Sequence, residues 1–211
     1  MNGHVGKTVI LPSTFIRSPW HMQQCYQDAM SIVGKTGKTD IFLTMTCNPN
    51  WKEIQENLLP GQEASDRPEL VARVFHLKKK RLLHKITKEN FFGVPVAHVD
   101  VVEFQKRGLP HVHLLITLAR GYKITTADIV DKYICAEIPD ESIFPTRHQI
   151  VMQNMIHGPC GDWCLKDNKC SKNSQKSFEN ETTLDQYGYP HYRRNAQMTY
   201  DRPNGHTVDN R

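Results

Sequence analysis

Two strand-like segments joined by a short loop place the strongest constraint on how this chain folds. Residues 94–105 and 111–118 are rich in β-branched and apolar side chains, and the loop Lys106–Pro110 between them contains a glycine. Segments with so short a connection pair as an antiparallel hairpin. A third segment, Asp40–Cys47, has the same β-rich character and ends at the turn residues Asn48-Pro49-Asn50. We therefore expect an antiparallel sheet.

Helical periodicity flanks these strands. Apolar residues recur at three- and four-residue steps over 19–34, and a second stripe follows a cap and a proline over 69–87. Ser65 and Asp66 are the expected cap residues. Shorter helices are expected over 126–136 and 146–156. The predicted fold class is therefore α+β, a central antiparallel sheet flanked by helices.

The regular pattern stops after residue 156. Residues 157–211 are polar and rich in aromatic, cysteine and basic side chains. We expect them to form a loop-rich extension whose order depends on something other than apolar burial. The chain thus divides into a core, 1–156, and an extension, 157–211. Near the amino end, Val9–Pro12 is expected to form a short strand or extended arm that the proline ends.

Composition excludes several classes of protein. No apolar run approaches the ~18–20 residues that a membrane-spanning helix needs, and Met1–Gly6 lacks the apolar centre of a signal peptide. We expect a nuclear or otherwise intracellular protein without a membrane partner, whose 6 cysteines are reduced or metal-bound. Cys25, Cys47 and Cys135 lie in apolar patterns and are expected in the core.

The charge permits a polyanionic partner without requiring one, since the net charge is +5. Lys78, Lys79, Lys80, Arg81 and Lys85 make much of the 69–87 helix positive. Such a run is typical either of a solvated helix face or of a phosphate-binding surface, and the sequence leaves both open.

The sharpest chemical feature is His111-Val112-His113 inside an apolar strand. Side chains two apart on a strand share a face and stand about 7 Å apart, so these imidazoles can converge on one ion. Glu103 and Gln105 are two residues apart on the neighbouring strand and so point to one face, and either could supply an oxygen ligand. Two nitrogens and one oxygen leave coordination positions open, as a catalytic ion requires. The alternatives are hydrogen-bonded core histidines and an exposed sheet face.

Other uses of a His-x-His pair fail at neighbouring positions. A His-x-His-x-Asp-His zinc hydrolase needs an aspartate where Leu115 stands, and a cupin site needs a glutamate near Thr117 and Leu118. The nucleobase deaminases need Pro-Cys-x-x-Cys, but Cys160 and Cys164 are one residue too far apart. The Gly-Lys-Thr triplets lack the preceding glycine of a phosphate-binding loop, so no ATP site is expected.

A second metal site is conceivable in the extension. His157, Cys160, Cys164 and Cys170 are four zinc-type ligands close together in the sequence. A structural Zn²⁺ held by them would order a region that has little core of its own. The spacing matches no common zinc finger, and reduced cysteines without a ligand are the alternative.

Several ordered motifs carry a resemblance. Phe42–Trp51 (FLTMTCNPNW) and Glu103–His113 (EFQKRGLPHVH) resemble the replication-initiator domain of Helitron transposons, also called the Helitron helicase-like domain. The shorter matching motifs are Val9–Ser13, Tyr26–Met30, Asp66–Pro68, Met155–Gly161, Lys169–Lys172 and Gly188–Arg194. The similarity runs over nearly the whole chain in one register, which makes it far more specific than a lone His-x-His.

The resemblance implies a rolling-circle Rep nuclease of the His-hydrophobic-His (HUH) class, a transposase domain for DNA nicking and strand transfer. Such enzymes bind Mg²⁺ or Mn²⁺ beside a scissile phosphate of single-stranded DNA. A tyrosine then attacks, leaving a 5′ phosphotyrosine and a free 3′ hydroxyl. It also implies His111 and His113 as metal ligands, Gln105 or Glu103 as the third ligand, and a helicase domain in full-length relatives.

The nucleophile is the point of departure from the family. In the family, the nucleophilic tyrosines lie on a helix downstream of the motif that corresponds to Tyr189–Arg194, whereas this sequence ends at Arg211 before such a helix. Tyr187 and Tyr200, like the tyrosines of the motif, lie in a polar stretch without a helical repeat, so we expect them to stack or pack. We expect metal binding without cleavage by this chain alone.

DNA binding is expected to weaken with salt, because basic residues contact phosphates. The expected phosphate contacts are Lys78, Lys79, Lys80, Lys85, Arg193 and Arg194. Trp51 and Trp163 could stack on bases. The alternative function is a nonenzymatic DNA- or zinc-binding module derived from a transposon.

Overall fold

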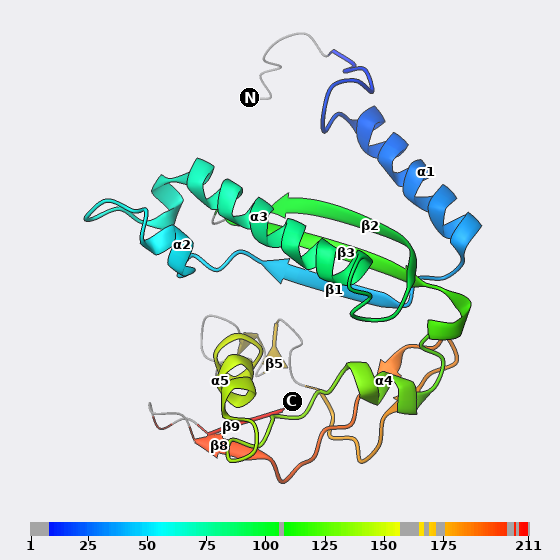
Figure 1. Cartoon of the computed structure of the whole chain (residues 1–211), viewed down its shortest axis with the longest axis vertical. Coiled ribbons are helices and arrows are strands. Elements are labelled where there is room, and N and C mark those ends of the chain that lie inside the picture. The colour runs from blue at the N-terminus through cyan, green and yellow to red at the C-terminus, as the bar shows by residue number, and fades with distance from the viewer. Residues whose placement is uncertain are drawn as a thin grey trace. The chain divides into compact units, whose positions relative to one another are not determined.

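The computed structural model describes residues 9–105, 108–156, 165–166, 169–171, 176–201, 205 and 207–210. The chain forms two compact units, Met1–Lys123 and Ile124–Arg211 (Figure 1). Helices and antiparallel sheets occur together, so the predicted α+β class is confirmed. The boundary between the units precedes α4 (Ala127–Tyr133) and α5 (Pro145–Asn154), and the predicted division into a core and an extension at residue 156 stays a prediction.

A three-stranded antiparallel sheet organises the first unit. Its strands are β1 (Ile41–Thr46), β2 (Pro95–Phe104) and β3 (Pro110–Leu118), in the order β1-β3-β2. The predicted hairpin of β2 and β3 is confirmed, because the two strands pair along their whole length. β1 pairs with the other side of β3, so β3 is the central strand.

Helices cover one face of this sheet. They are α2 (Lys52–Gln55) and α3 (Pro68–Thr87), and Figure 1 shows α3 lying along the strands. Ile54 of α2 and Phe75 of α3 are 0% and 3% exposed and belong to one buried cluster with Val112 of β3. Successive strand side chains alternate between faces. The residues on either side of Val112 therefore project from the opposite face.

The start of α3 differs in detail from the prediction. A 3-10 turn, η1 (Ala64–Asp66), precedes α3 and is capped reciprocally by Glu63 and Asp66. Arg67 occupies the cap position of α3 and makes no side-chain capping bond, so the prediction of Ser65 and Asp66 as its cap is wrong. Pro68 begins the helix, where its missing N–H leaves no hydrogen bond unmade.

The first helix, α1 (Pro19–Thr36), forms as the periodicity predicts but is not buried. Ser18 caps it by accepting a hydrogen bond from the His21 N–H, and Gly37, with φ of 86°, ends it. None of its residues is buried, and Cys25 is exposed. The expectation of a core Cys25 is therefore wrong, because an apolar stripe predicts a helix without specifying what packs on it. Residues 9–12 form no strand, which leaves the extended arm of the two predicted alternatives.

The second unit consists of short elements. They are α4 (Ala127–Tyr133), α5 (Pro145–Asn154), β4 (Leu165–Lys166), β5 (Lys169–Cys170), β6 (Thr183–Leu184), β7 (Pro190–His191), β8 (Thr199–Asp201) and β9 (Thr207–Asp209). Within its described residues, the buried apolar side chains are Val130, Ile138 and Val208. Cys135 is exposed, contrary to expectation, whereas Cys47 of the first unit is buried as predicted.

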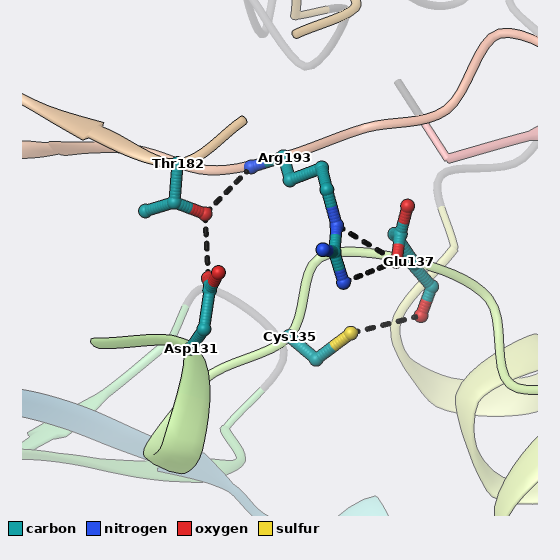
Figure 2. Close-up of polar contacts among 5 residues, drawn as sticks. All are labelled: Asp131, Cys135, Glu137, Thr182 and Arg193. Atoms are coloured by element: carbon teal, nitrogen blue, oxygen red, sulfur yellow. Dashed lines mark hydrogen bonds and ion pairs between the residues drawn. The ribbon is translucent and has the colours of Figure 1, made fainter. Parts of the chain in front are cut away.

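Polar contacts connect α4 to the later segments of this unit (Figure 2). The Thr182 hydroxyl donates to Asp131 Oδ1 over 2.5 Å and accepts the Arg193 N–H over 3.0 Å. The Arg193 guanidinium contacts Glu137 Oε2, with Nη2 at 3.1 Å. The Cys135 Sγ lies 3.9 Å from the Glu137 carbonyl oxygen. This network joins α4 and the residues after it to the segments that contain Thr182 and Arg193.

Across the described residues, no helix combines the length and the apolar character needed to cross a bilayer.

Candidate functional site

The two histidines lie on the face of the sheet that α3 does not cover. His111 is directly opposite Thr46 of β1 and Glu103 of β2. The rings of His111 and His113 have centroids 4.5 Å apart and planes inclined by 72°. As the strand periodicity predicts, both imidazoles share one face, while Val112 between them is 1% exposed in the core.

Each imidazole has its own neighbours. His111 Nδ1 lies 2.7 Å from the Thr46 Oγ1, which is a hydrogen bond across the β1–β3 pair. His113 stacks on Phe42 with a centroid distance of 5.6 Å and an interplanar angle of 6°. Its Nε2 lies 3.6 Å from Glu103 Oε2. The two rings are therefore oriented by side chains of the flanking strands.

The site is open to solvent. The His113 side chain is 34% exposed and that of Glu103 is 63% exposed. Phe42 and Val101 on the same face are 64% and 46% exposed. These histidines are therefore not sealed core residues, and their face of the sheet is accessible to solvent.

The third ligand stays open between two residues, as it was in the sequence. Glu103 is already close to His113, whereas Gln105 follows the end of β2 and has an exposed side chain. The Gln105 N–H donates to the Leu109 carbonyl over 2.9 Å and closes the hairpin turn. Gly108 in this turn has φ of 74°, a left-handed conformation that favours glycine.

The donors fit a divalent ion in their chemistry. Two imidazole nitrogens with a carboxylate or carboxamide oxygen suit Mn²⁺ and other borderline or hard cations. Among the described residues, no three His, Cys, Asp or Glu side chains form a ready metal-binding group. A metal site with Glu103 as the third ligand therefore needs a movement of side chains toward one ion. A site with Gln105 as the third ligand would have two imidazoles and a carboxamide oxygen instead of a carboxylate.

Three of the predicted DNA-binding lysines, Lys78, Lys79 and Lys85, are engaged in ion pairs. Lys78 Nζ lies 2.7 Å from Glu53 Oε1 and 4.8 Å from the centroid of the Trp51 ring. Lys79 pairs with Asp100 of β2. The Trp51 ring therefore faces a lysine in this structure, and it also packs against the apolar core.

The other predicted cations have different surroundings. Lys80 is exposed and forms no ion pair among the described residues, whereas Lys85 lies 3.4 Å from Glu89. All four lysines belong to α3, which covers the face opposite the histidines. Arg193 is paired with Glu137, which raises the pKa of the guanidinium further. The guanidinium of Arg194 lies 5.8 Å from the centre of the Tyr192 ring.

Most of the possible zinc ligands fall outside the described residues. His157, Cys160 and Cys164 are in this group, as is Trp163. Cys170 lies on β5 and is half-buried. The structural zinc site stays a prediction.

The tyrosines of the carboxy-terminal part of the second unit, from Tyr187 to Tyr200, lie outside helices. Tyr187 and Tyr189 lie between β6 and β7, where Asp185 accepts both of their backbone N–H groups over 2.8 Å. Burial raises the pKa of Tyr192, which is the opposite of what activates a phenol as a nucleophile. Tyr200 of β8 packs against His148, with ring centroids 4.6 Å apart.

A cavity of about 720 Å³ lies between α5 and β8 in the second unit. His148 and Tyr200 line it together with the carboxylates of Glu141 and Asp201. His148 is 8% exposed, and its Nδ1 is 2.8 Å from the Pro139 carbonyl oxygen. Two carboxylates on the lining make this cavity unfavourable for a phosphate. No sequence pattern predicts this cavity, because its walls are distant in the chain.

Comparison with known proteins identifies the family. The family described as the Helitron helicase-like domain at the N-terminus matches residues 1–116. The match spans more than half of the chain and includes both His111 and His113. This chain therefore belongs to the Helitron helicase-like N-terminal domain family, and its function is transposon-related. No curated protein matches the chain.

Proposed function

We propose that the open face of the sheet binds a divalent cation and single-stranded DNA, as the nicking and strand-transfer site of a Helitron-type HUH rolling-circle initiator. One observation carries this proposal. Two imidazoles of one strand, 4.5 Å apart between ring centroids, share with Glu103 a face that the helices leave uncovered. Membership of the family supports it.

The proposed ligands are His111 and His113, with Gln105 or Glu103 as the oxygen donor. A bound Mg²⁺ or Mn²⁺ would polarise a scissile phosphate and stabilise charge that develops on its oxygens. The strand keeps the imidazoles in place, because Val112 and Leu114 beside them are each 1% exposed. Ligands carried on a rigid strand lose little freedom when they bind an ion.

Single-stranded DNA on this face would meet Phe42 and Thr44 as well as the histidines. Phe42 is exposed enough to stack on a base. The cations of α3 lie on the other side of the sheet, so Lys80 and Lys85 would contact phosphates away from the ion. We assign the nucleophile to no described tyrosine. The role proposed for this face is to bind and orient the scissile phosphate.

Metal binding is the direct test. We expect calorimetric titration of the full chain with Mn²⁺ to show one site that His111→Ala and His113→Ala each abolish. His98→Ala is the matched control, because His98 is an exposed histidine on β2. If the wild type binds no Mn²⁺, or if the control loses as much affinity as His111→Ala, the proposed metal site is wrong.

DNA binding is tested separately by fluorescence anisotropy with a labelled single strand. We expect binding that strengthens with Mn²⁺, weakens in chelator and falls as salt rises, since phosphate contacts release counterions. Phe42→Ala should weaken binding several-fold, because stacking on an aromatic ring contributes about 1–3 kcal/mol per base. Equal binding of wild type and His111→Ala with and without Mn²⁺ would contradict a shared site.

A further inference from the structure

We infer that Thr46 is a positioning residue for His111, which rests on the proposed metal site. Thr46 Oγ1 accepts a hydrogen bond from the His111 Nδ1–H, so that Nε2 keeps its lone pair for the ion. The distance of 2.7 Å between Thr46 Oγ1 and His111 Nδ1 is that of a good hydrogen bond. The two residues are direct partners across β1 and β3.

The bond decides which nitrogen can be a ligand. A neutral imidazole carries one proton, so one nitrogen donates and the other accepts. Nδ1 is occupied by Thr46 whichever of the two atoms carries the hydrogen. Nε2 of His111 is therefore the nitrogen left to bind an ion, and it can do so only when Nδ1 holds the proton. Fixing the tautomer in this way is the usual role of the second partner of a ligating histidine.

The backbone around Thr46 fixes where its hydroxyl points. Thr46 is the last residue of β1, and the next residue, Cys47, is 2% exposed. The Cys47 N–H donates to the Pro110 carbonyl over 3.0 Å, at the residue just before His111. A β-branched side chain has few χ1 choices. The hydroxyl is thus held beside the histidine by pairing that does not depend on the site.

Thr44 offers an internal comparison. It lies on the same face of β1 and is opposite His113. Thr44 is exposed, and its hydroxyl makes no hydrogen bond among the described residues. The neighbours of the His113 ring are Phe42 and Glu103 instead. The two threonines therefore share type, strand and face, and differ in whether they hydrogen-bond to an imidazole.

The expected effect is moderate because the bond is accessible to water. Loss of a partner that orients a ligating histidine typically costs 10–100-fold in metal affinity. Water can replace part of an exposed hydrogen bond, so we expect about a tenfold loss, at the low end of that range. Thr46→Val keeps the β-branched shape and so preserves the strand.

The experiment compares Thr46→Val, Thr46→Ser and Thr44→Val in the full chain. Calorimetry with Mn²⁺ should show about a tenfold weaker affinity for Thr46→Val, recovery to within about twofold for Thr46→Ser, and no change for Thr44→Val. Nitrogen NMR of the metal-free chain should show a larger Nδ1–H fraction for His111 in the wild type than in Thr46→Val.

Each outcome decides the inference. Wild-type affinity in Thr46→Val, failure of Thr46→Ser to recover, or an equal loss in Thr44→Val would overturn it, as would an unchanged tautomer. If the wild type binds no Mn²⁺, the proposed function fails. The tautomer measurement still tests the role of Thr46, because it needs no metal.

Discussion

Different interactions stabilise the interior of each of the two units. In the first unit, Ile54, Phe75 and Ile86 are at most 3% exposed and form its apolar interior with residues of β3. In the described part of the second unit, burial of apolar side chains is limited to Val130, Ile138 and Val208. There, side chains such as Thr182 connect distant segments by hydrogen bonds.

A precisely positioned site requires a rigid support, and the two units differ in the support that they provide. The free energy gained by burying apolar side chains is proportional to the buried area and scarcely depends on salt or pH. The strength of ion pairs and carboxylate contacts depends on both. The histidines project from the central strand of the unit with the larger apolar interior. The basic residues of the second unit are instead partly engaged in its own contacts, as Arg193 is with Glu137.

The largest expected effect is on the first unit. Phe75→Ala removes a side chain that is 3% exposed and should lower the free energy of unfolding by about 3–5 kcal/mol. Urea unfolding measures this loss, and hydrogen exchange should show it at the amides of β3 and not at those of β6 and β7. Leu77→Ala, at a 60% exposed position of the same helix, is the control and should change stability by less than about 0.5 kcal/mol.

Equal loss of protection in both units after Phe75→Ala would show that they unfold as one. The two units would then differ in the kind of contact that they contain but would not have separate free energies of unfolding.

A smaller effect is expected in the second unit from Thr182→Val. Thr182 is 7% exposed, and the change leaves Asp131 and the Arg193 N–H without their partner. An unsatisfied buried group costs about 1–3 kcal/mol, and the low end, about 1 kcal/mol, is expected here because Asp131 and Arg193 belong to exposed positions that water can reach. Hydrogen exchange of the Arg193 amide measures the opening of this segment. Thr183→Val, at the exposed neighbouring position, should leave that exchange rate unchanged.

The smallest effect is a response to pH in the turn between β6 and β7. The N–H of Tyr189, and then that of Tyr187, hold the pKa of Asp185 below its ordinary value of 3.8. Because the pKa of Asp185 is lowered in the folded state, its ionised carboxylate stabilises the turn at neutral pH. That stabilisation is lost as pH falls below 3.8 through the folded-state value. We expect the Tyr189 amide proton to shift in NMR over this acidic range.

Asp185→Asn should remove that pH response, because the amide oxygen accepts the same hydrogen bonds without titrating. A titration of the Tyr189 amide that persists in Asp185→Asn would assign the response to another group.

Much of the first unit follows from local pattern. The strands and long helices form within a few residues of their predicted ranges, since periodicity reports one element at a time. The shared face of His111 and His113 follows from the same periodicity. Burial does not, as Cys25 of α1 shows: its stripe is helical, yet nothing in the periodicity says that another element covers it.

Pairs between distant residues required the tertiary structure. The sequence predicts a strand that contains Thr46 and a strand that contains His111, but only the β1–β3 register places them opposite each other. The same is true of Lys79, a surface cation in the helical pattern that pairs with Asp100 of β2 in the fold. The elements and the common face of the histidines follow from the sequence, because backbone geometry is local. Strand order, register and covered face depend on contacts between segments far apart in the chain, and those contacts exist only once it has folded.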